Sequence, residues 1–186
     1  RSWNTSKIAF LLQDTWLKHR IDISLGVFDL LVLDFDGVLT NNSVYVSEQG
    51  EEWVRCSRSD GLAFDYLRKV GKPTYIMSTE QNPVVRRRAE KLKIPVLQGI
   101  GNKKEQIVQL ASKLGIQLER ILYVGNDVND LAAMRSVGYS VCPADSHPRI
   151  LEEAGIVLNT PGGAGVIREL LEVVLRIDLG KELYGE

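Results

Sequence analysis

The sequence has few cysteines and histidines and no excess of charge of either sign. Its 186 residues include two of each, and two cysteines cannot build the disulfide framework of a small secreted protein. Lysine and arginine total 23 against 24 aspartate and glutamate residues, which gives a formal net charge of -1. Nucleic acid is therefore not an expected partner, because its binding depends on neutralising phosphates with basic side chains.

Long hydrophobic runs are also missing. No stretch approaches the roughly 18 apolar residues of a membrane-spanning helix, and no basic segment precedes an apolar signal core with a cleavage site. We therefore expect a cytoplasmic protein with no membrane partner. The first residue is Arg1 rather than methionine, which is consistent with a processed or excised piece of a longer protein.

Hydrophobic residues make up 44% of the chain and charged residues 25%, the balance of a globular domain with a sizeable core. We expect three parts. Residues 1–29 form a helical extension or linker, residues 30–178 form the main domain, and residues 179–186 form a loose tail. The extension is predicted from apolar residues near helical spacing, namely Ile8, Leu11, Leu12 and Trp16.

From residue 30 onward, short apolar runs alternate with amphipathic segments. Strands are expected over 30–35, 74–77, 96–97, 121–124, 139–142 and 156–158. Helices are expected over 61–70, 83–93, 103–114, 128–137, 148–153 and 166–177. This alternation predicts an α/β fold, a Rossmann-like parallel sheet with helices on both faces. Residues 43–57 alternate around Gln49-Gly50 and predict a β-hairpin flap.

Polar residues gather where several predicted strands end. Their shared feature is an oxygen or ammonium group, and they are Asp34, Asp36, Ser78, Thr79, Glu80, Lys103, Asn126, Asp127 and Asp130. Ligands of open parallel sheets bind outside the carboxyl ends of the strands. Several oxygen ligands favour a hard cation such as Mg²⁺, and a lysine and a serine beside it suit phosphoryl oxygens. Each residue alone is as well explained by a turn or a helix cap.

Together these residues resemble the haloacid dehalogenase-like phosphatases, whose first motif is Asp-x-Asp-Gly-x-Leu/Val-Thr. Residues 34–40 read DFDGVLT. The resemblance covers about residues 30–178 and is closest to the capless branch that dephosphorylates eight- and nine-carbon sugar acids. The further matching stretches are SDG at 59–61, GNDVNDL at 125–131, PAD at 143–145 and PGGAGVIREL at 161–170.

The resemblance implies a role for each motif residue. Asp34 matches the nucleophile, which would form an aspartyl-phosphate, and Asp36 matches the general acid and base. Ser78, Thr79 and Lys103 match the residues that hold the phosphoryl group. Asp34, with the backbone carbonyl of Asp36, also matches the Mg²⁺ ligands.

Two positions are ambiguous. Asn126 stands where the family usually has a metal-binding carboxylate, so either Asn126 or the neighbouring Asp127 completes the metal site. An asparagine oxygen coordinates a hard cation without adding charge. Lys104 is the alternative to Lys103 by one step of register.

Glu80 and Lys91 match a pair that the nonulosonate enzymes carry, whereas octulosonate enzymes tend to have Gly-Arg after the motif hydroxyl. The pair favours a nine-carbon substrate, a KDN or sialic acid 9-phosphate, with 3-deoxy-octulosonate 8-phosphate as the alternative. The other interpretation of the pair is a capping glutamate and an exposed lysine.

The gaps between the motifs hold no lid domain, so the site would be open to water. The apolar 43–57 hairpin is more hydrophobic than a free flap requires. We expect it at a subunit interface, and the resembled branch implies a homotetramer.

Two other functions compete with a phosphatase. A non-catalytic oligomerisation or regulatory domain of a CMP-sialic acid synthetase is compatible with the atypical start of the chain, but a relic need not retain its nucleophile. A response-regulator receiver also uses Asp, Ser/Thr and Lys. Receivers place the phosphorylated Asp on a middle strand, whereas Asp34 follows the first core strand.

Overall fold

A computed structural model describes residues 23–185. The amphipathic helix expected around Ile8 to Trp16 lies outside these residues. The core is a six-stranded parallel sheet with the strand order β5-β4-β1-β6-β7-β8. Its strands are β1 (Leu30–Leu33), β4 (Thr74–Ser78), β5 (Val96–Gln98), β6 (Ile121–Val124), β7 (Tyr139–Cys142) and β8 (Ile156–Val157). The predicted α/β class with a parallel sheet is confirmed.

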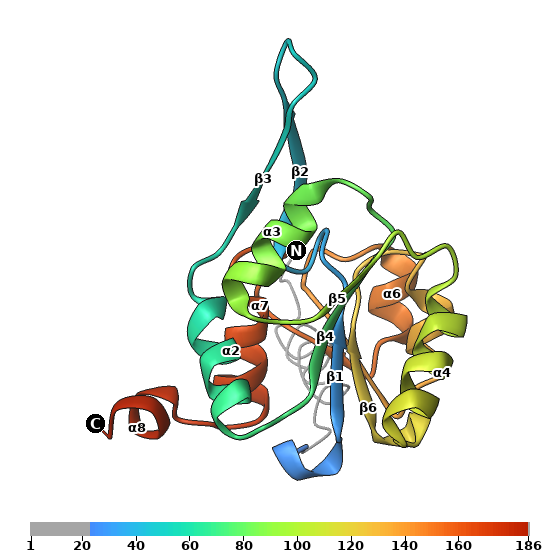
Figure 1. The fold of residues 1–186 in the computed structure, drawn as a ribbon. Coiled ribbons are helices and arrows are strands. Elements are labelled where there is room, and N and C mark those ends of the chain that lie inside the picture. Colours follow the sequence, from blue (N-terminus) through green and yellow to red (C-terminus); the bar gives the residue numbers. More distant parts are fainter. Residues whose placement is uncertain (1–22, 186) are drawn as a thin grey trace, which may run out of the picture.

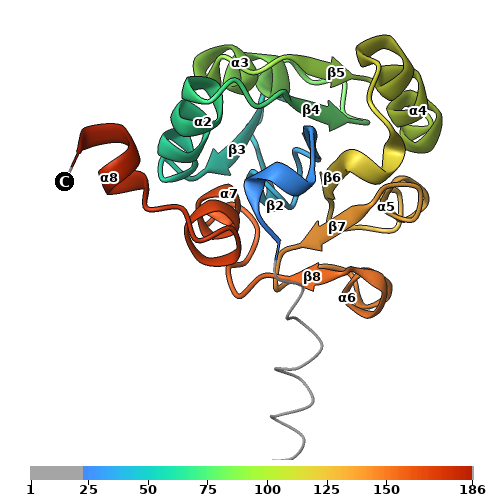
Figure 2. The same ribbon diagram turned by 90° about the horizontal axis from the view of Figure 1, so that it is seen from below.

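Helices cover both faces of this sheet (Figure 2). The α-helices are α2 (Asp60–Lys69), α3 (Pro83–Leu92), α4 (Lys103–Leu114), α5 (Leu131–Met134), α6 (Pro148–Glu153), α7 (Val166–Glu169) and α8 (Leu179–Tyr184). Short 3-10 turns are η1 (Leu25–Val27) and η2 (Leu118–Arg120). One face carries α2, α3 and α7, and the other carries α4, α5 and α6.

The central strand β1 shows why the core has two halves. All four of its residues are buried, and successive side chains of a strand point to opposite faces. Leu31 and Leu33 pack in the cluster under α2, α3 and α7. Leu30 and Val32 pack in the cluster under α4, α5 and α6. β1 ends at Leu33, so the next residue, Asp34, lies at the carboxyl edge of the sheet.

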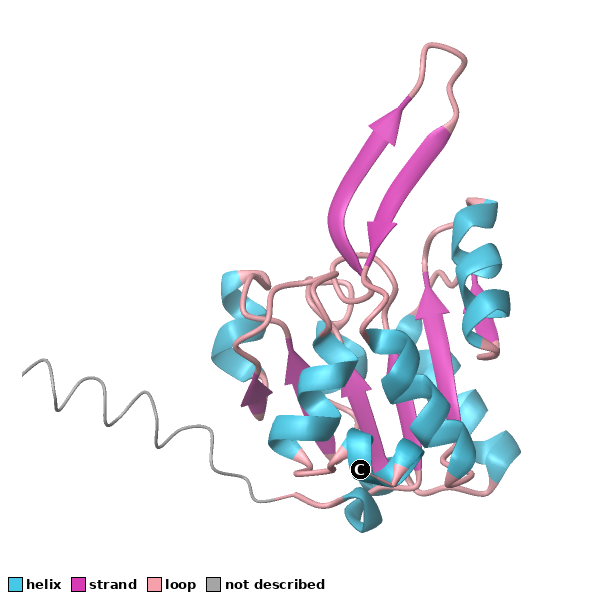
Figure 3. Cartoon of the chain, turned by 90° about the vertical axis from the view of Figure 1, so that its left-hand side faces the viewer, coloured by secondary structure: helices cyan, strands magenta, loops and turns pink. Residues whose placement is uncertain are grey.

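A separate two-stranded hairpin leaves this edge, as Figures 1 and 3 show. It consists of β2 (Thr40–Val46) and β3 (Glu52–Cys56), paired antiparallel with Tyr45 opposite Trp53. The predicted hairpin over residues 43–57 is therefore present. Its outer part is apolar and open to solvent, with Tyr45 58% and Trp53 63% exposed.

Two helices differ from the sequence prediction. The helix expected over 128–137 is only the four residues of α5, because the side chain of Asp130 accepts from the backbone N–H groups of Asn126 and Asp127 and holds that stretch as a loop. The helix expected over 166–177 turns π-helical at η3 (Leu170–Val174). There the N–H of Leu175 bonds to the carbonyl of Leu170 at 2.9 Å.

The expected loose tail over 179–186 is wrong for Leu179–Tyr184, which forms α8. Asp178 caps it by accepting from the N–H of Lys181 at 3.0 Å, and Leu179 is 1% exposed. This apolar anchor holds the segment against the body of the domain. No helix in residues 23–185 combines the length and the apolar character needed to cross a membrane.

Candidate active site

Asp34 follows the last residue of β1 and is 5% exposed. One carboxylate oxygen, Oδ1, accepts from the N–H of Phe35 at 2.7 Å. The other, Oδ2, lies 2.7 Å from Nζ of Lys103. Asp34 is therefore held at the carboxyl edge of the sheet by one backbone donor and one cation.

Lys103 is the first residue of α4, and its side chain is buried between two carboxylates. Besides Asp34, its Nζ contacts Oδ1 of Asp130 at 2.6 Å. Lys103 is 3% exposed, whereas the neighbouring Lys104 faces solvent. Lys103, and not Lys104, is therefore the lysine that contacts Asp34.

Asp130 is among the polar residues that the sequence places at this edge but without a role, and Tyr123 is a site residue that the sequence prediction did not include. Asp130 is fully buried and accepts from Lys103, from the Tyr123 hydroxyl at 2.8 Å, and from the backbone N–H groups of Asn126 and Asp127. Four donors compensate for burying its charge. The spacing of GNDVND was a signal for Asp130, but Tyr123 stands in an apolar strand run where a hydroxyl gives no functional signal.

Asp36 lies two residues beyond Asp34 and is partly buried. Its Oδ1 accepts from the hydroxyl of Thr40 at 3.3 Å, and the same hydroxyl accepts from the N–H of Gly37 at 3.2 Å. Gly37 has a positive φ of 74°, a conformation that glycine adopts without strain. The DFDGVLT loop therefore turns so that both aspartates stay at the same edge.

Ser78 ends β4, next to β1 in the sheet, and is 1% exposed. Its hydroxyl accepts from the N–H of Glu80 at 3.1 Å. Thr79 and Glu80 are exposed beyond it. Glu80 Oε1 accepts from the N–H groups of Gln81 and Asn82, at 2.6 and 2.8 Å, so it closes the turn that leads to α3.

Asn126, after β6, is buried against the Asp34–Asp36 loop. A Cβ on Gly37 would lie 1.9 Å from its Nδ2, and its Oδ1 is buried without a hydrogen-bond partner among the described residues. Asp127 is more exposed, and its Oδ1 accepts from the N–H of Val128 at 2.7 Å. Of the two candidates, Asn126 is the one that offers an unused oxygen inside the site.

The buried charges shift their neighbours' pKa values. Burial and the charge of Asp130 raise the pKa of Asp34 to about 7, against the opposing effect of Lys103. Burial alone would lower the pKa of Lys103, but the charges of Asp34 and Asp130 raise it above its usual value. Burial also raises the pKa of Asp36, opposed by the Thr40 hydrogen bond. A carboxyl with a raised pKa can hold and release a proton near neutral pH.

Lys91 stands apart from the other predicted site residues. It is exposed near the carboxyl end of α3, whereas Glu80 precedes the amino end of that helix. A helix rises about 1.5 Å per residue, so the two residues lie at opposite ends of α3. The remaining predicted residues meet at the carboxyl edge of β1, β4 and β6.

A buried lysine-aspartate pair, a second aspartate with a raised pKa, and a serine beside them form an aspartate-based phosphoryl-transfer site on an α/β fold. Comparison with known proteins agrees. The haloacid dehalogenase-like hydrolase model matches residues 81–170. The 3-deoxy-D-manno-octulosonate 8-phosphate phosphatase of Salmonella typhi is 35% identical over 147 residues, 78% of this chain and 78% of that protein.

Solved structures show the same relationship. A HAD family hydrolase from Streptomyces avermitilis has a TM-score of 0.82 and 45% identity, covering 86% of this chain and 91% of its own. The octulosonate 8-phosphate phosphatase of Moraxella catarrhalis, solved with magnesium, phosphate and KDO, has a TM-score of 0.76 and 29% identity, covering 80% and 86%. The chain belongs to the haloacid dehalogenase-like hydrolases, and within them to the capless phosphatase branch of these relatives.

Proposed function

We propose that this chain is a Mg²⁺-dependent phosphomonoesterase that acts on a phosphorylated sugar acid, with 3-deoxy-octulosonate 8-phosphate as the first candidate. The observation that carries the activity is the buried contact between Lys103 and Asp34, 2.7 Å long, at the sheet edge that also holds Ser78. If the ion pair were only structural, the neighbouring serine, the second aspartate and the unpaired amide oxygen would have no explanation. A catalytic role accounts for all of them.

Each of these residues has its own step in the proposed reaction. The Asp34 carboxylate attacks phosphorus, while Asp36 gives its proton to the departing alkoxide oxygen. Asp36 then takes a proton from water, which attacks the aspartyl-phosphate and releases phosphate and free Asp34. Lys103 and Ser78 face the phosphoryl oxygens and offset their charge. Lys103 also favours the ionised, nucleophilic form of Asp34.

The residues present fit Mg²⁺. The buried Oδ1 of Asn126 has no partner among the described residues and lies beside the loop of Asp34 and Asp36. Carboxylate, amide and backbone carbonyl oxygens are the ligands that this cation prefers. Residues 23–185 contain no group of three or more His, Cys, Asp and Glu placed to hold a metal, so the site depends on an amide and a carbonyl. When bound, Mg²⁺ would neutralise charge on the phosphoryl group.

The choice between substrates rests on two observations. The relatives that match over most of the chain are octulosonate 8-phosphate phosphatases, which supports the eight-carbon substrate. Glu80 was the reason to expect a nine-carbon acid such as KDN or sialic acid 9-phosphate, but here it bonds the backbone of its own turn, and Lys91 lies at the other end of α3. This arrangement favours the capping role for Glu80.

The exposed apolar surface of the hairpin supports a second part of the proposal, an assembly of several copies of this chain. Val44, Tyr45, Val46 and Trp53 are 53% to 65% exposed on one projecting element, an apolar surface that a monomer would leave in water. We propose that it packs against further copies of this chain in a homotetramer and covers the open site. A Trp53→Lys variant should then run as a smaller species in sizing experiments, and a fully active wild-type monomer would contradict this part.

The test measures phosphate release with Mg²⁺ from a panel of 3-deoxy-octulosonate 8-phosphate and the KDN and sialic acid 9-phosphates. Wild type is compared with Asp34→Asn, which keeps the shape and removes the nucleophile. We expect turnover by the wild type alone and the highest kcat/KM on the 8-phosphate. Preference for a 9-phosphate would select the alternative substrate. No turnover of any ester would favour the non-catalytic role in a CMP-sialic acid synthetase.

A further inference from the structure

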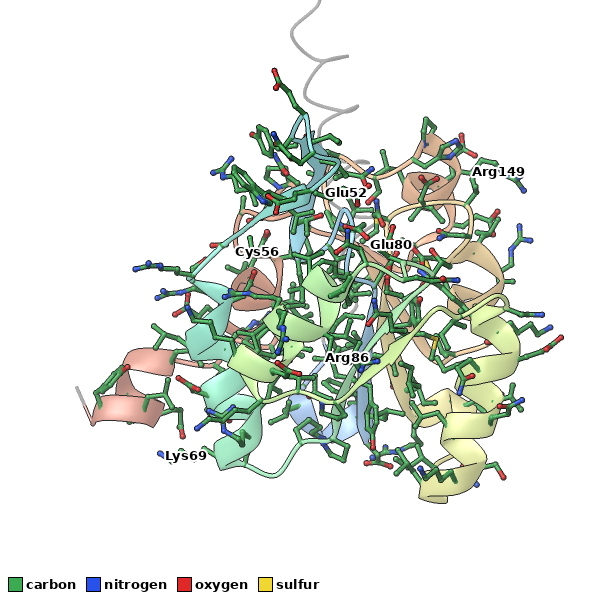
Figure 4. The ribbon with its side chains drawn as sticks, turned by 45° about the horizontal axis from the view of Figure 1, so that its top comes forward. Glu52, Cys56, Lys69, Glu80, Arg86 and Arg149 are labelled. Carbon is green, nitrogen blue, oxygen red and sulfur yellow. The ribbon has the colours of Figure 1, made fainter. Side chains whose placement is uncertain are left out.

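The segment between β7 and α6 contacts two loops at the carboxyl edge of the sheet. The N–H of His147 donates to the backbone carbonyl of Asn126 at 2.9 Å. Asp145, two residues earlier, accepts at its Oδ1 from the N–H of Gly162 at 2.8 Å. Figure 4 turns this edge of the sheet toward the viewer, and the label Arg149 marks the start of α6, just beyond the segment. One short segment is therefore bonded both to the turn that carries Asn126 and to the loop that carries Gly162.

The glycine loop, residues 161–165, packs directly against the DFDGVLT loop. The N–H of Gly163 donates to the carbonyl of Val38 at 3.0 Å. A Cβ on Gly162 would lie 2.3 Å from the carbonyl oxygen of Gly37, so there is no room for a side chain between the two loops. The position of the DFDGVLT loop therefore depends on where the glycine loop lies.

Carboxylates hold the glycine loop at two points. Just before it, Glu169 of α7 accepts from the N–H of Thr160 at 2.7 Å. Within it, Asp145 accepts from the backbone as described above. Gly163 and Gly165 have positive φ, 67° and 107°, and a chain rich in glycine has many backbone conformations open to it. The bond to Asp145 therefore selects one conformation of a loop that could adopt several.

Thr40 connects the glycine loop to the general acid of the proposed reaction. Its hydroxyl donates to Oδ1 of Asp36 at 3.3 Å. A Cβ on Gly163 would lie 2.6 Å from the carbonyl carbon of Thr40, and one on Gly162 would lie 2.9 Å from its carbonyl oxygen. A displacement of the glycine loop therefore displaces Thr40 as well, and with it the hydrogen bond that orients the Asp36 side chain.

The nucleophile is held by a different set of contacts. Asp34 bonds the N–H of Phe35 and Nζ of Lys103, and these two bonds do not involve the glycine loop. Resting on the proposed phosphatase activity, we propose that Asp145 is a positioning residue that keeps Asp36 in place to protonate the departing alkoxide. It acts through the glycine loop and does not itself touch the substrate. Loss of its bond disturbs the general acid more than the nucleophile.

The experiment compares wild type, Asp145→Ala, Asp145→Asn and a matched control, Glu152→Ala, which removes an exposed carboxylate from the neighbouring α6. Alanine removes the acceptor for the N–H of Gly162, whereas asparagine keeps an oxygen for it. One ester is the sugar acid phosphate of the panel above that the wild type hydrolyses fastest, whose alkoxide needs a proton as it leaves. The other is p-nitrophenyl phosphate, whose phenolate leaves without one. We measure kcat and KM with saturating Mg²⁺, because kcat/KM covers the steps up to release of the leaving group.

In Asp145→Ala, kcat/KM for the sugar acid phosphate should fall about tenfold relative to that for p-nitrophenyl phosphate. This is less than the roughly 100-fold that a misplacement of about 1 Å can cost, and it lies within what a general acid contributes. The loss should be in kcat for the sugar acid phosphate. Asp145→Asn and Glu152→Ala should keep the ratio within about twofold of wild type.

Three results overturn the role of Asp145 alone: an unchanged ratio in Asp145→Ala, a loss that lies only in KM, or the same loss in Asp145→Asn as in Asp145→Ala. An equal loss of kcat/KM on both esters is one form of the unchanged ratio, and it would mean that the bond to Gly162 supports the fold without favouring the general acid. A wild type that hydrolyses neither ester overturns the proposed function and this inference together.

Discussion

Nζ of Lys103 lies 2.7 Å from Oδ2 of Asp34, and both side chains are almost fully buried. Removing the cation leaves two buried carboxylates, Asp34 and Asp130, facing one another. We expect Lys103→Met to lower kcat at least about 100-fold, as loss of a charge-stabilising donor does. It should also cost about 3–5 kcal/mol of unfolding free energy, as for other broken buried pairs.

The control is Lys104→Met, one residue along the same helix and exposed to solvent. Its unfolding free energy should stay within about 0.5 kcal/mol of wild type. Phosphate release and urea unfolding are measured on both variants. Equal losses in the two would mean that α4 needs a lysine for a reason unrelated to Asp34.

The Tyr123 hydroxyl is one of four donors to Asp130, at 2.8 Å. Tyr123→Phe removes this donor and leaves the ring in place in the core. We expect a loss of about 1.5–3 kcal/mol of unfolding free energy, the usual size for a hydrogen bond to a charged group, and a smaller loss of kcat than in Lys103→Met. Tyr184→Phe, at a residue 65% exposed, is the control. An unchanged Tyr123→Phe would show that the other three donors suffice.

Alanine substitutions at Gly37 and Gly71 distinguish the cost of backbone strain from the cost of a clash with Asn126. Both have positive φ, 74° and 67°, but a Cβ on Gly37 would lie 1.9 Å from Nδ2 of Asn126, whereas one on Gly71 would have nothing within 4 Å. Gly71→Ala should cost about 1–2 kcal/mol from strain alone. Gly37→Ala should cost more in urea unfolding and abolish turnover, because Asn126 must move. Equal costs and retained activity would show that the loop accommodates the methyl group.

In the proposed metal site Asn126 would contribute an oxygen without a charge, so its replacement by aspartate should strengthen Mg²⁺ binding. We expect Asn126→Asp to lower the dissociation constant for Mg²⁺ about tenfold, since charge count tunes affinity at oxygen sites. Calorimetric titration of the phosphate-free protein measures this without relying on activity. Asn126→Leu should bind Mg²⁺ more weakly than wild type. If Asp127→Ala weakens binding and Asn126→Leu does not, the assignment is reversed.

The sheet could be predicted because its strands are short, mostly apolar runs, of which the central β1 and β6 are buried along their whole length. β6 and β7 and helices α4 and α6 have the predicted bounds. The motif residues could be placed at one edge because parallel strands share an orientation. Lys103 was preferred with Lys104 as the alternative, and the sequence could not exclude Lys104, since the choice depends on the rotation of α4 that brings one side chain between two carboxylates.

Other features depend on which partners particular side chains bind, and the sequence pattern does not show this. Tyr123 belongs to the site only because β6 lies beside β1. The shortening of α5 depends on Asp130 using its carboxylate for backbone donors of the preceding loop. The helix in Leu179–Tyr184 depends on Leu179 being buried, a contact with a distant part of the chain. Glu80 and Lys91 lie eleven positions apart, and almost the whole of α3 stands between them. They are therefore at opposite ends of that helix and not side by side.

Asp60, the first residue of α2, is a buried carboxylate outside the catalytic site. Its Oδ1 accepts from the N–H groups of Ile167 and Arg168, at 2.9 and 3.2 Å, while Oδ2 has no hydrogen-bond partner among the described residues. Burial raises the pKa of Asp60 to about 6, against these two bonds and the charge of Arg88. An unfolded aspartate titrates near pH ~3.9.

Between these pH values the native state binds a proton that the unfolded state has released. The free energy of unfolding therefore falls as pH rises from about 4 to about 6, by up to about 3 kcal/mol. Asp60→Asn keeps an acceptor for the two N–H groups and does not titrate. Its stability relative to wild type should rise across this pH interval and then level off.

Urea unfolding at several pH values between 4 and 8 measures this difference, with Asp65→Asn on the exposed side of the same helix as the control. The control should follow the pH dependence of wild type, because it leaves Asp60 in place. A fall in the relative stability of Asp60→Asn with rising pH would mean that the two N–H groups and Arg88 stabilise the charged form more than burial disfavours it. The carboxylate would then be a stabilising tie between α2 and α7 at neutral pH.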